Sequence, residues 1–380
     1  MAPIAALSLA LWAIVALVPV ATAGAADETE ATMEGMFETV SFLLPLSLSD
    51  ERFEDPASRD AILAALQTLE ASGSQLEAHG RAQGAGFAFL SRSLARDGAD
   101  IRKRYESGRV AEARFLLHQL TENCVACHSR LPSDSEFPLG QRFVQQASIA
   151  ELPLEERVNL EMATRQFDRA LATYEALFAS PETSPTDLDL MGHFDGYLEL
   201  SIRIRQDAKR PARVFEQFST RPDLSPALRA NLSQWIASLH ALEKRRLGGS
   251  DVGQARALLR EAEGAEHFDD TRAALVSYTA ASSVLHRFVA ANPQDGRELA
   301  EAYYWLGVIE SRIGRTFWLS QTEYFLEAAI RLAPSSPFAH KAYDLLEEFV
   351  VSGYTGSAGV NVPADEKARL QELRALIGRS

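Results

Sequence analysis

Two cysteines and a histidine stand together about a third of the way along the chain, in the stretch TENCVACHSRLP of residues 121–132. Cys124 and Cys127 are the only cysteines among 380 residues, and His128 directly follows the second one. Three kinds of chemistry use thiols at this spacing: a redox dithiol, half of a zinc site, and covalent attachment of a haem. The sequence around the motif separates them.

The surrounding residues favour haem attachment. A redox C-x-x-C follows a strand and opens a helix, whereas here the helical pattern RVAEARFLLHQL precedes the cysteines. A structural zinc ion needs four ligands, and the sequence has no second C-x-x-C and no H-x-x-x-H. In C-x-x-C-H, two thiols on neighbouring helix faces can bond both vinyl groups of one haem edge, and His128 then offers its imidazole as proximal iron ligand. A disulfide or two ordinary buried thiols remain as alternatives.

The first 26 residues are expected to be a signal peptide. They contain no charged side chain, and an apolar run is followed by Ala21-Thr22-Ala23, a small-x-small cleavage pattern. The run of about 17 apolar residues is marginal for a membrane span, so cleavage after export is favoured over a retained anchor. The mature protein is therefore expected in the periplasm, with contact to a membrane only if this segment stays uncleaved.

Residues 27–131 are expected to form four antiparallel helices. Apolar residues recur at helical spacing in four segments of about 20 residues, which corresponds to about 30 Å each. Short turns separate the segments, and Pro132 ends the last one. Short connections make such helices neighbours in an up-down-up-down bundle. The expected helices cover about 28–47, 57–79, 84–106 and 109–130.

A four-helix bundle with C-x-x-C-H near the end of its last helix resembles cytochrome c-prime and its low-spin relatives. The resemblance implies thioether bonds from Cys124 and Cys127 and a proximal iron ligand at His128. In the low-spin members, and in the related b-type bundle cytochromes, a Met near the start of the first helix is the sixth ligand. Met33 is the preferred candidate because it stands a few residues into the mature chain, and Met36, three residues further on the same face, is the alternative.

Two further residues enter through comparison with known cytochromes. The family often carries a basic residue beyond the motif, and Arg130 is the candidate for that role near a haem propionate. Another class of small cytochromes places its Met about 60 residues after the motif, the distance at which Met191 follows His128. That second fold is disfavoured because it leaves residues 28–120 unexplained. The other histidines, including His118, show no ligand spacing and are interpreted as ordinary.

The rest of the chain is expected to be a helical repeat domain. Residues 132–150 are rich in turn formers and are typical of a linker. Within residues 151–380, three stretches share small, aromatic and Pro positions that resemble degenerate tetratricopeptide repeats. In such repeats small residues let paired helices approach, and the stack presents a concave surface for a partner. The three stretches are 165–181, 275–293 and 298–334.

Composition limits the functions. A net charge of −14 argues against a nucleic-acid partner, which needs a basic face. We expect an all-α monohaem electron carrier rather than an enzyme, with a redox partner protein and a protein docked on the repeats, or with the repeats forming a homo-oligomer. The alternative is a five-coordinate haem protein that binds nitric oxide or carbon monoxide and signals through the repeats. A peroxidase needs a distal acid–base pair, for which the sequence offers no support.

Overall fold

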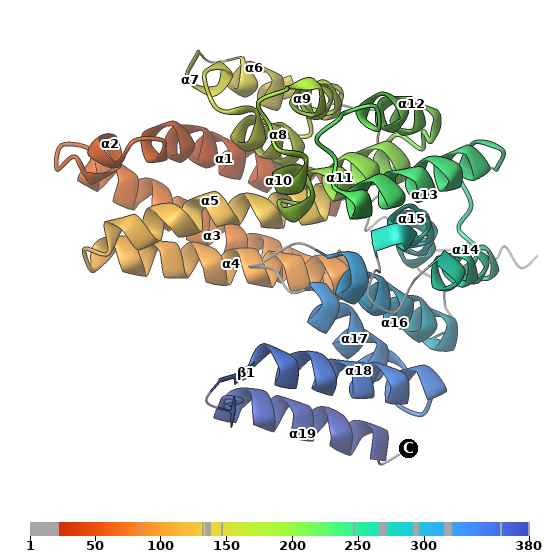
Figure 1. Ribbon diagram of the computed structural model, residues 1–380. Helices are drawn as coiled ribbons and strands as arrows, with labels where there is room; N and C mark the ends of the chain where they lie inside the picture. Colours follow the sequence, from red (N-terminus) through yellow and green to blue (C-terminus); the bar gives the residue numbers. More distant parts are fainter. Residues whose placement is uncertain are drawn as a thin grey trace, which may run out of the picture.

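The chain is built almost wholly of helices (Figure 1). The computed structural model describes residues 23–83, 85–130, 133, 138–145, 147–245, 248–265, 272–291, 296–314, 321–357 and 359–378. Within these ranges the strands are the short antiparallel pair β1 (Thr355–Gly356) and β2 (Gly359–Val360), so the predicted all-α class is confirmed. No helix of the described residues is long and apolar enough to cross a membrane. The predicted signal peptide lies outside these residues except for its last four positions.

Four long helices open the described chain and lie side by side (Figure 1). The observed ends of these helices lie within five residues of the ends that the amphipathic pattern predicts. A fifth, short helix begins after Ser49, whose hydroxyl accepts a hydrogen bond from the Arg52 amide. The helices are α1 (Ala23–Ser47), α2 (Asp50–Glu54), α3 (Arg59–Gln83), α4 (Ala85–Glu106) and α5 (Val110–His128).

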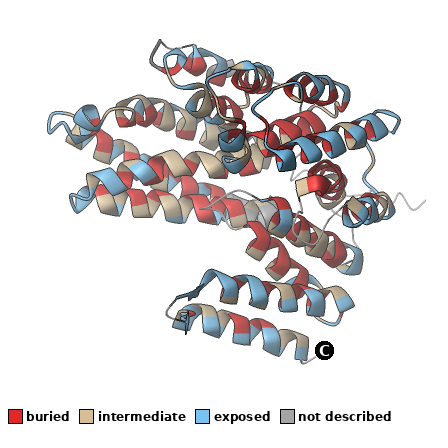
Figure 2. Cartoon of the chain, in the orientation of Figure 1, coloured by how far each residue is buried: buried red, intermediate tan, exposed pale blue. Residues whose placement is uncertain are grey.

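Each of these helices carries buried positions (Figure 2), and the buried apolar residues belong to one core. Leu43, Ile62 and Ile101 are fully buried in it. Helices α3 and α4 approach closely at Gly73. A Cβ atom at this position would lie only 2.7 Å from the Ala95 Cα atom. Packing of this kind requires glycine, because any larger side chain would push the two helices apart.

The end of α1 is fixed against α5 by polar contacts. The Ser47 Oγ and His118 Nε2 atoms lie 2.9 Å apart, and Arg114 Nε donates a hydrogen bond of 2.5 Å to the Ser47 carbonyl. The two helices run in opposite directions from this point. His118, which the sequence presents as ordinary, therefore sets the register between the first and fourth long helices.

The interval predicted as a linker contains helices that join this core. Helices α6 (Pro138–Val144) and α7 (Ala147–Ala150) precede α8 (Leu154–Ala163), which packs against α5. The Phe143 ring meets the Phe37 ring of α1 edge-on, with centroids 5.8 Å apart. Ile149 and Leu160 belong to the same apolar core as α1. The described part of the interval thus covers α1 and α5 rather than only connecting two domains.

A second, larger apolar core holds the remaining helices together. Consecutive helices pack side by side, and the stretch 298–334 contains a close pair, in which a Cβ at Gly307 would lie 2.5 Å from Leu326 Cδ2. The elements are α9 (Phe167–Ala179), α10 (Pro185–Leu190), α11 (His193–Leu198), the π-helix η1 (Glu199–Ile204), α12 (Lys209–Phe218), α13 (Pro226–Glu243), α14 (Val252–Ala265), the 3₁₀ turn η2 (Arg272–Ala274), α15 (Leu275–Ala290), α16 (Gly296–Ile313), α17 (Gln321–Leu332), α18 (Pro337–Gly353) and α19 (Ala364–Gly378).

Candidate haem-attachment site

The two cysteines lie in the last two turns of α5 and are free thiols. Their spacing of three residues places them on neighbouring positions of one helix face. Burial raises the pKa of the Cys124 thiol to about 12, and burial also raises the pKa of Cys127. A catalytic dithiol needs a lowered thiol pKa because the thiolate is the nucleophile. The environment therefore does not suit a redox dithiol.

His128 is held in one tautomer by the second half of the chain. Its Nδ1 atom lies 2.9 Å from the carbonyl oxygen of Ala163, at the end of α8. Because a carbonyl only accepts, Nδ1 carries the proton and Nε2 carries the lone pair. Burial, with a smaller contribution from the charge of Arg165, lowers the pKa of His128 to about 4. At neutral pH the imidazole is therefore uncharged, which is the form that binds metal ions.

The Ala163 carbonyl is available because of the way α8 ends. The amide of Gln166 donates to the Glu161 carbonyl at 2.7 Å, and the amide of Arg165 donates to the Met162 carbonyl at 3.1 Å. This pair of bonds is a Schellman motif, which satisfies two of the last carbonyls of the helix. The next carbonyl, that of Ala163, receives the His128 proton instead. A helix end thus supplies the acceptor that orients the imidazole.

The last residues of α5 are enclosed by both halves of the molecule. Val125 packs against the second core, while Ala126 and Cys127 contact Leu90 and Phe89 of α4. The Phe89 ring stacks on Tyr324 of α17 with centroids 4.3 Å apart. The motif therefore lies where the N-terminal helices meet α8 and α17.

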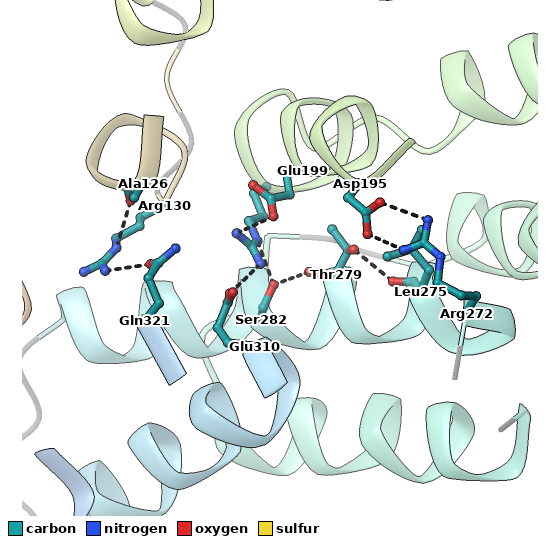
Figure 3. A network of polar contacts seen from close by, with 11 residues as sticks. Ala126, Arg130, Asp195, Glu199, Arg272, Leu275, Thr279, Ser282, Glu310 and Gln321 are labelled. Atoms are coloured by element: carbon teal, nitrogen blue, oxygen red, sulfur yellow. Dashed lines mark hydrogen bonds and ion pairs between the residues drawn. The ribbon is translucent and has the colours of Figure 1, made fainter. Parts of the chain in front are cut away.

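Arg130 joins α5 to α17 (Figure 3). Its Nε donates to the Ala126 carbonyl and its NH2 group donates to Gln321 Oε1, each at 3.0 Å. The guanidinium also lies over the Phe325 ring, 5.3 Å from the centroid. These contacts show that Arg130 ties α5 to α17.

Both candidate methionines lie at the motif end of α1. Met36 precedes Ser47 by 11 residues and His128 follows His118 by ten, so along antiparallel helices they lie about 16 and 15 Å from the Ser47–His118 contact. Met36 is buried in the core that also holds Leu120 of α5. Met33 is partly buried against the same core, one turn further out at about 21 Å. The helix register thus places Met36 nearer the level of His128.

The structure gives less support to Met191 as an iron ligand. Met191, the ligand of the disfavoured second fold, is 70 % exposed just after α10. Within the described residues no group of three or more His, Cys, Asp and Glu side chains is arranged to hold a metal ion.

A charge network joins η1, α15 and α16. The Glu199 carboxylate lies 3.3 Å from a guanidinium nitrogen of Arg203. Glu310 lies 3.3 Å from another nitrogen of the same guanidinium, and Arg203 Nε donates to Ser282 Oγ at 2.7 Å (Figure 3). Two carboxylates thus share one cation, and burial raises the pKa of Glu199 to about 7. The sequence carries no sign of this network because Arg203 and Glu310 lie 107 residues apart.

The Glu199 pKa predicts a pH dependence of stability. A carboxyl whose pKa rises from 4.5 unfolded to about 7 folded binds more protons in the native state, so stability falls as pH rises between these values. Glu199→Gln, which resembles the protonated form, should match the wild type at pH 5 and exceed its free energy of unfolding by about 2–3 kcal/mol at pH 8. Urea titrations at both pH values measure this difference. An equal difference at both pH values would contradict the assignment.

Neither a protein-family model nor a curated protein nor a solved structure matches the chain. The assignment of the site therefore depends on the residues and on their geometry.

Proposed function

We propose that the chain is an exported monohaem c-type cytochrome that carries electrons. The observation that supports this most is the pairing of two free thiols with an uncharged imidazole at the end of one helix, with Nδ1 of that imidazole bound to a backbone carbonyl. Cys124 and Cys127 would form the thioethers, and His128 would bind the iron through Nε2. The haem, when bound, supplies a one-electron Fe(III)/Fe(II) couple.

The described residues fit such a group. Free thiols and an uncharged imidazole share one face of α5. The Met36 side chain lies at about the same level on α1, in an apolar core. The packing of α1, α3, α4 and α5 supports a bundle like that of cytochrome c-prime. Close helix pairs such as α16 and α17 support tetratricopeptide-like repeats in the second half, where a protein partner would dock.

The distal ligand is proposed to be a methionine of α1. Methionine with histidine keeps iron six-coordinate and raises its potential, which suits electron transfer. Met33 is favoured by its place in the mature chain, but the register set by Ser47 and His118 favours Met36. We therefore propose Met36 as the ligand, with Met33 as the alternative.

Absorption spectra test the function. The purified protein should give a pyridine haemochrome typical of covalently bound haem, and its ferric form should show the charge-transfer band of Met ligation at the red edge of the visible spectrum. Absence of covalent haem from protein exported with an active haem-attachment system would refute the proposal. Rapid binding of carbon monoxide by the reduced protein, without displacement of a ligand, would instead favour the five-coordinate gas-binding alternative.

Two single variants identify the distal ligand. Met36→Ala is expected to lose the red charge-transfer band because the proposed distal sulfur is then absent, whereas Met33→Ala is expected to keep it. Spectra of the two ferric proteins at equal haem content measure this. Loss of the band only in Met33→Ala would identify Met33 as the ligand. Survival of the band in both variants would exclude a methionine ligand from α1.

Export is part of the proposal. The small-x-small pattern ending at Ala23 predicts cleavage after that residue. The intact mass of the mature protein, corrected for one haem, measures the site. A mass that includes all 380 residues would indicate a retained anchor.

A further inference from the structure

The residue that follows the end of α8 has an unusual backbone conformation for its type. Arg165 has φ of +58°, in the left-handed region where glycine is the usual residue of a Schellman motif. Among the other described residues, Gln206 is the one non-glycine residue with a positive φ. The chain thus places a long cationic side chain where glycine would fit without strain.

The Arg165 side chain belongs to the surroundings of the motif. Its backbone lies two residues beyond Ala163, whose carbonyl binds His128 at 2.9 Å. Its NH2 group donates to Ser133 Oγ at 2.8 Å, a few residues after the motif. Arg165 is therefore held between the end of α8, which binds His128, and a residue that closely follows the motif.

We infer that the positive charge of Arg165 raises the reduction potential of a haem bound through His128. This inference rests on the proposed function. Reduction adds one electron from an external donor to ferric iron, and no bond is formed or broken. A fixed positive charge favours the state that has gained the electron, and it does so strongly where protein shields it from water. The second half of the chain would thus tune the iron as well as dock a partner.

The test compares reduction potentials of the full-length haem-loaded proteins. Arg165→Gly removes the charge and suits the backbone, so it should fold at least as well as the wild type. It is expected to lower the Fe(II)/Fe(III) ratio at a fixed applied potential about tenfold, which equals about 59 mV for one electron. Arg165→Asn, a residue that also tolerates positive φ, should give the same shift. Arg165→Lys should keep most of the wild-type potential.

Gln206→Gly is the matched control, because it relieves the same backbone conformation without changing charge. It should leave the potential unchanged. An unchanged potential in Arg165→Gly and Arg165→Asn, in samples whose pyridine haemochrome confirms covalent haem, would overturn the inference and leave the proposed function intact. An equal loss of potential in Arg165→Lys would overturn it too, because charge would not be the cause. Wild-type protein without covalent haem would refute the proposed function, and the inference with it.

Discussion

The double variant Cys124→Ser/Cys127→Ser is expected to release its haem into acidified acetone, whereas the wild type keeps nearly all of it in the protein fraction. Both thiols are free and share one face of α5, and a serine hydroxyl cannot take the place of a thioether. Haem content of the protein after extraction, measured by pyridine haemochrome, reports the difference.

The single variants Cys124→Ser and Cys127→Ser are the controls for this result. Each keeps one thioether, so each should retain haem through extraction. The orientation of His128 by Ala163 does not depend on the thiols, so the double variant should still bind haem non-covalently. Haem that survives extraction in the double variant would contradict attachment at this motif.

Arg203→Met is expected to lower the free energy of unfolding by about 3–5 kcal/mol at pH 8, the range for removing one partner of a buried ion pair. The guanidinium is 3 % exposed and serves both Glu199 and Glu310. Without it, the two carboxylates lose their shared cation, and the Glu310 side chain is only 7 % exposed. The loss should shrink at pH 5, because Glu199 with its pKa of about 7 is then protonated. Urea titrations followed by circular dichroism measure both values.

Arg331→Met provides the matched control for Arg203. Arg331 is 42 % exposed and pairs with Glu327 in the same helix and with Glu372. Exposed pairs of this kind contribute at most about 1 kcal/mol. A loss for Arg203→Met no larger than that of Arg331→Met would show that the buried network does not stabilise the fold.

The long helices could be predicted from the sequence, and the short ones could not. In α3 and α4 the apolar period is sustained over many turns, so pattern alone locates them. Helices α6 and α7 have too few residues to be stable alone, and tertiary packing stabilises them. Phe143 supplies that packing by its contact with Phe37, which lies more than 100 residues earlier in the sequence. The same turn-forming residues that suggest a linker are compatible with such short helices.

The residues of the candidate site could be predicted from the sequence, but the contacts that orient them could not. Cys124, Cys127 and His128 form a contiguous motif, so spacing alone suggests them as a haem-attachment site. The acceptor for His128 lies 35 residues away, and the backbone of a helix end has no sequence signature for that role. The proposal of Met36 in place of Met33 depends on the contact of Ser47 with His118, which only the folded chain displays.

The bond from Arg130 to Gln321 also has a consequence for the order of events during synthesis. The two residues are 191 positions apart, and ribosomes add about 5–20 residues per second. Helix α17 is therefore completed about 10–40 s after α5. The Arg130–Gln321 hydrogen bond and the stacking of Phe89 on Tyr324 form only after that. The end of α5 thus packs first on α4, through Ala126 and Leu90, and joins α17 later.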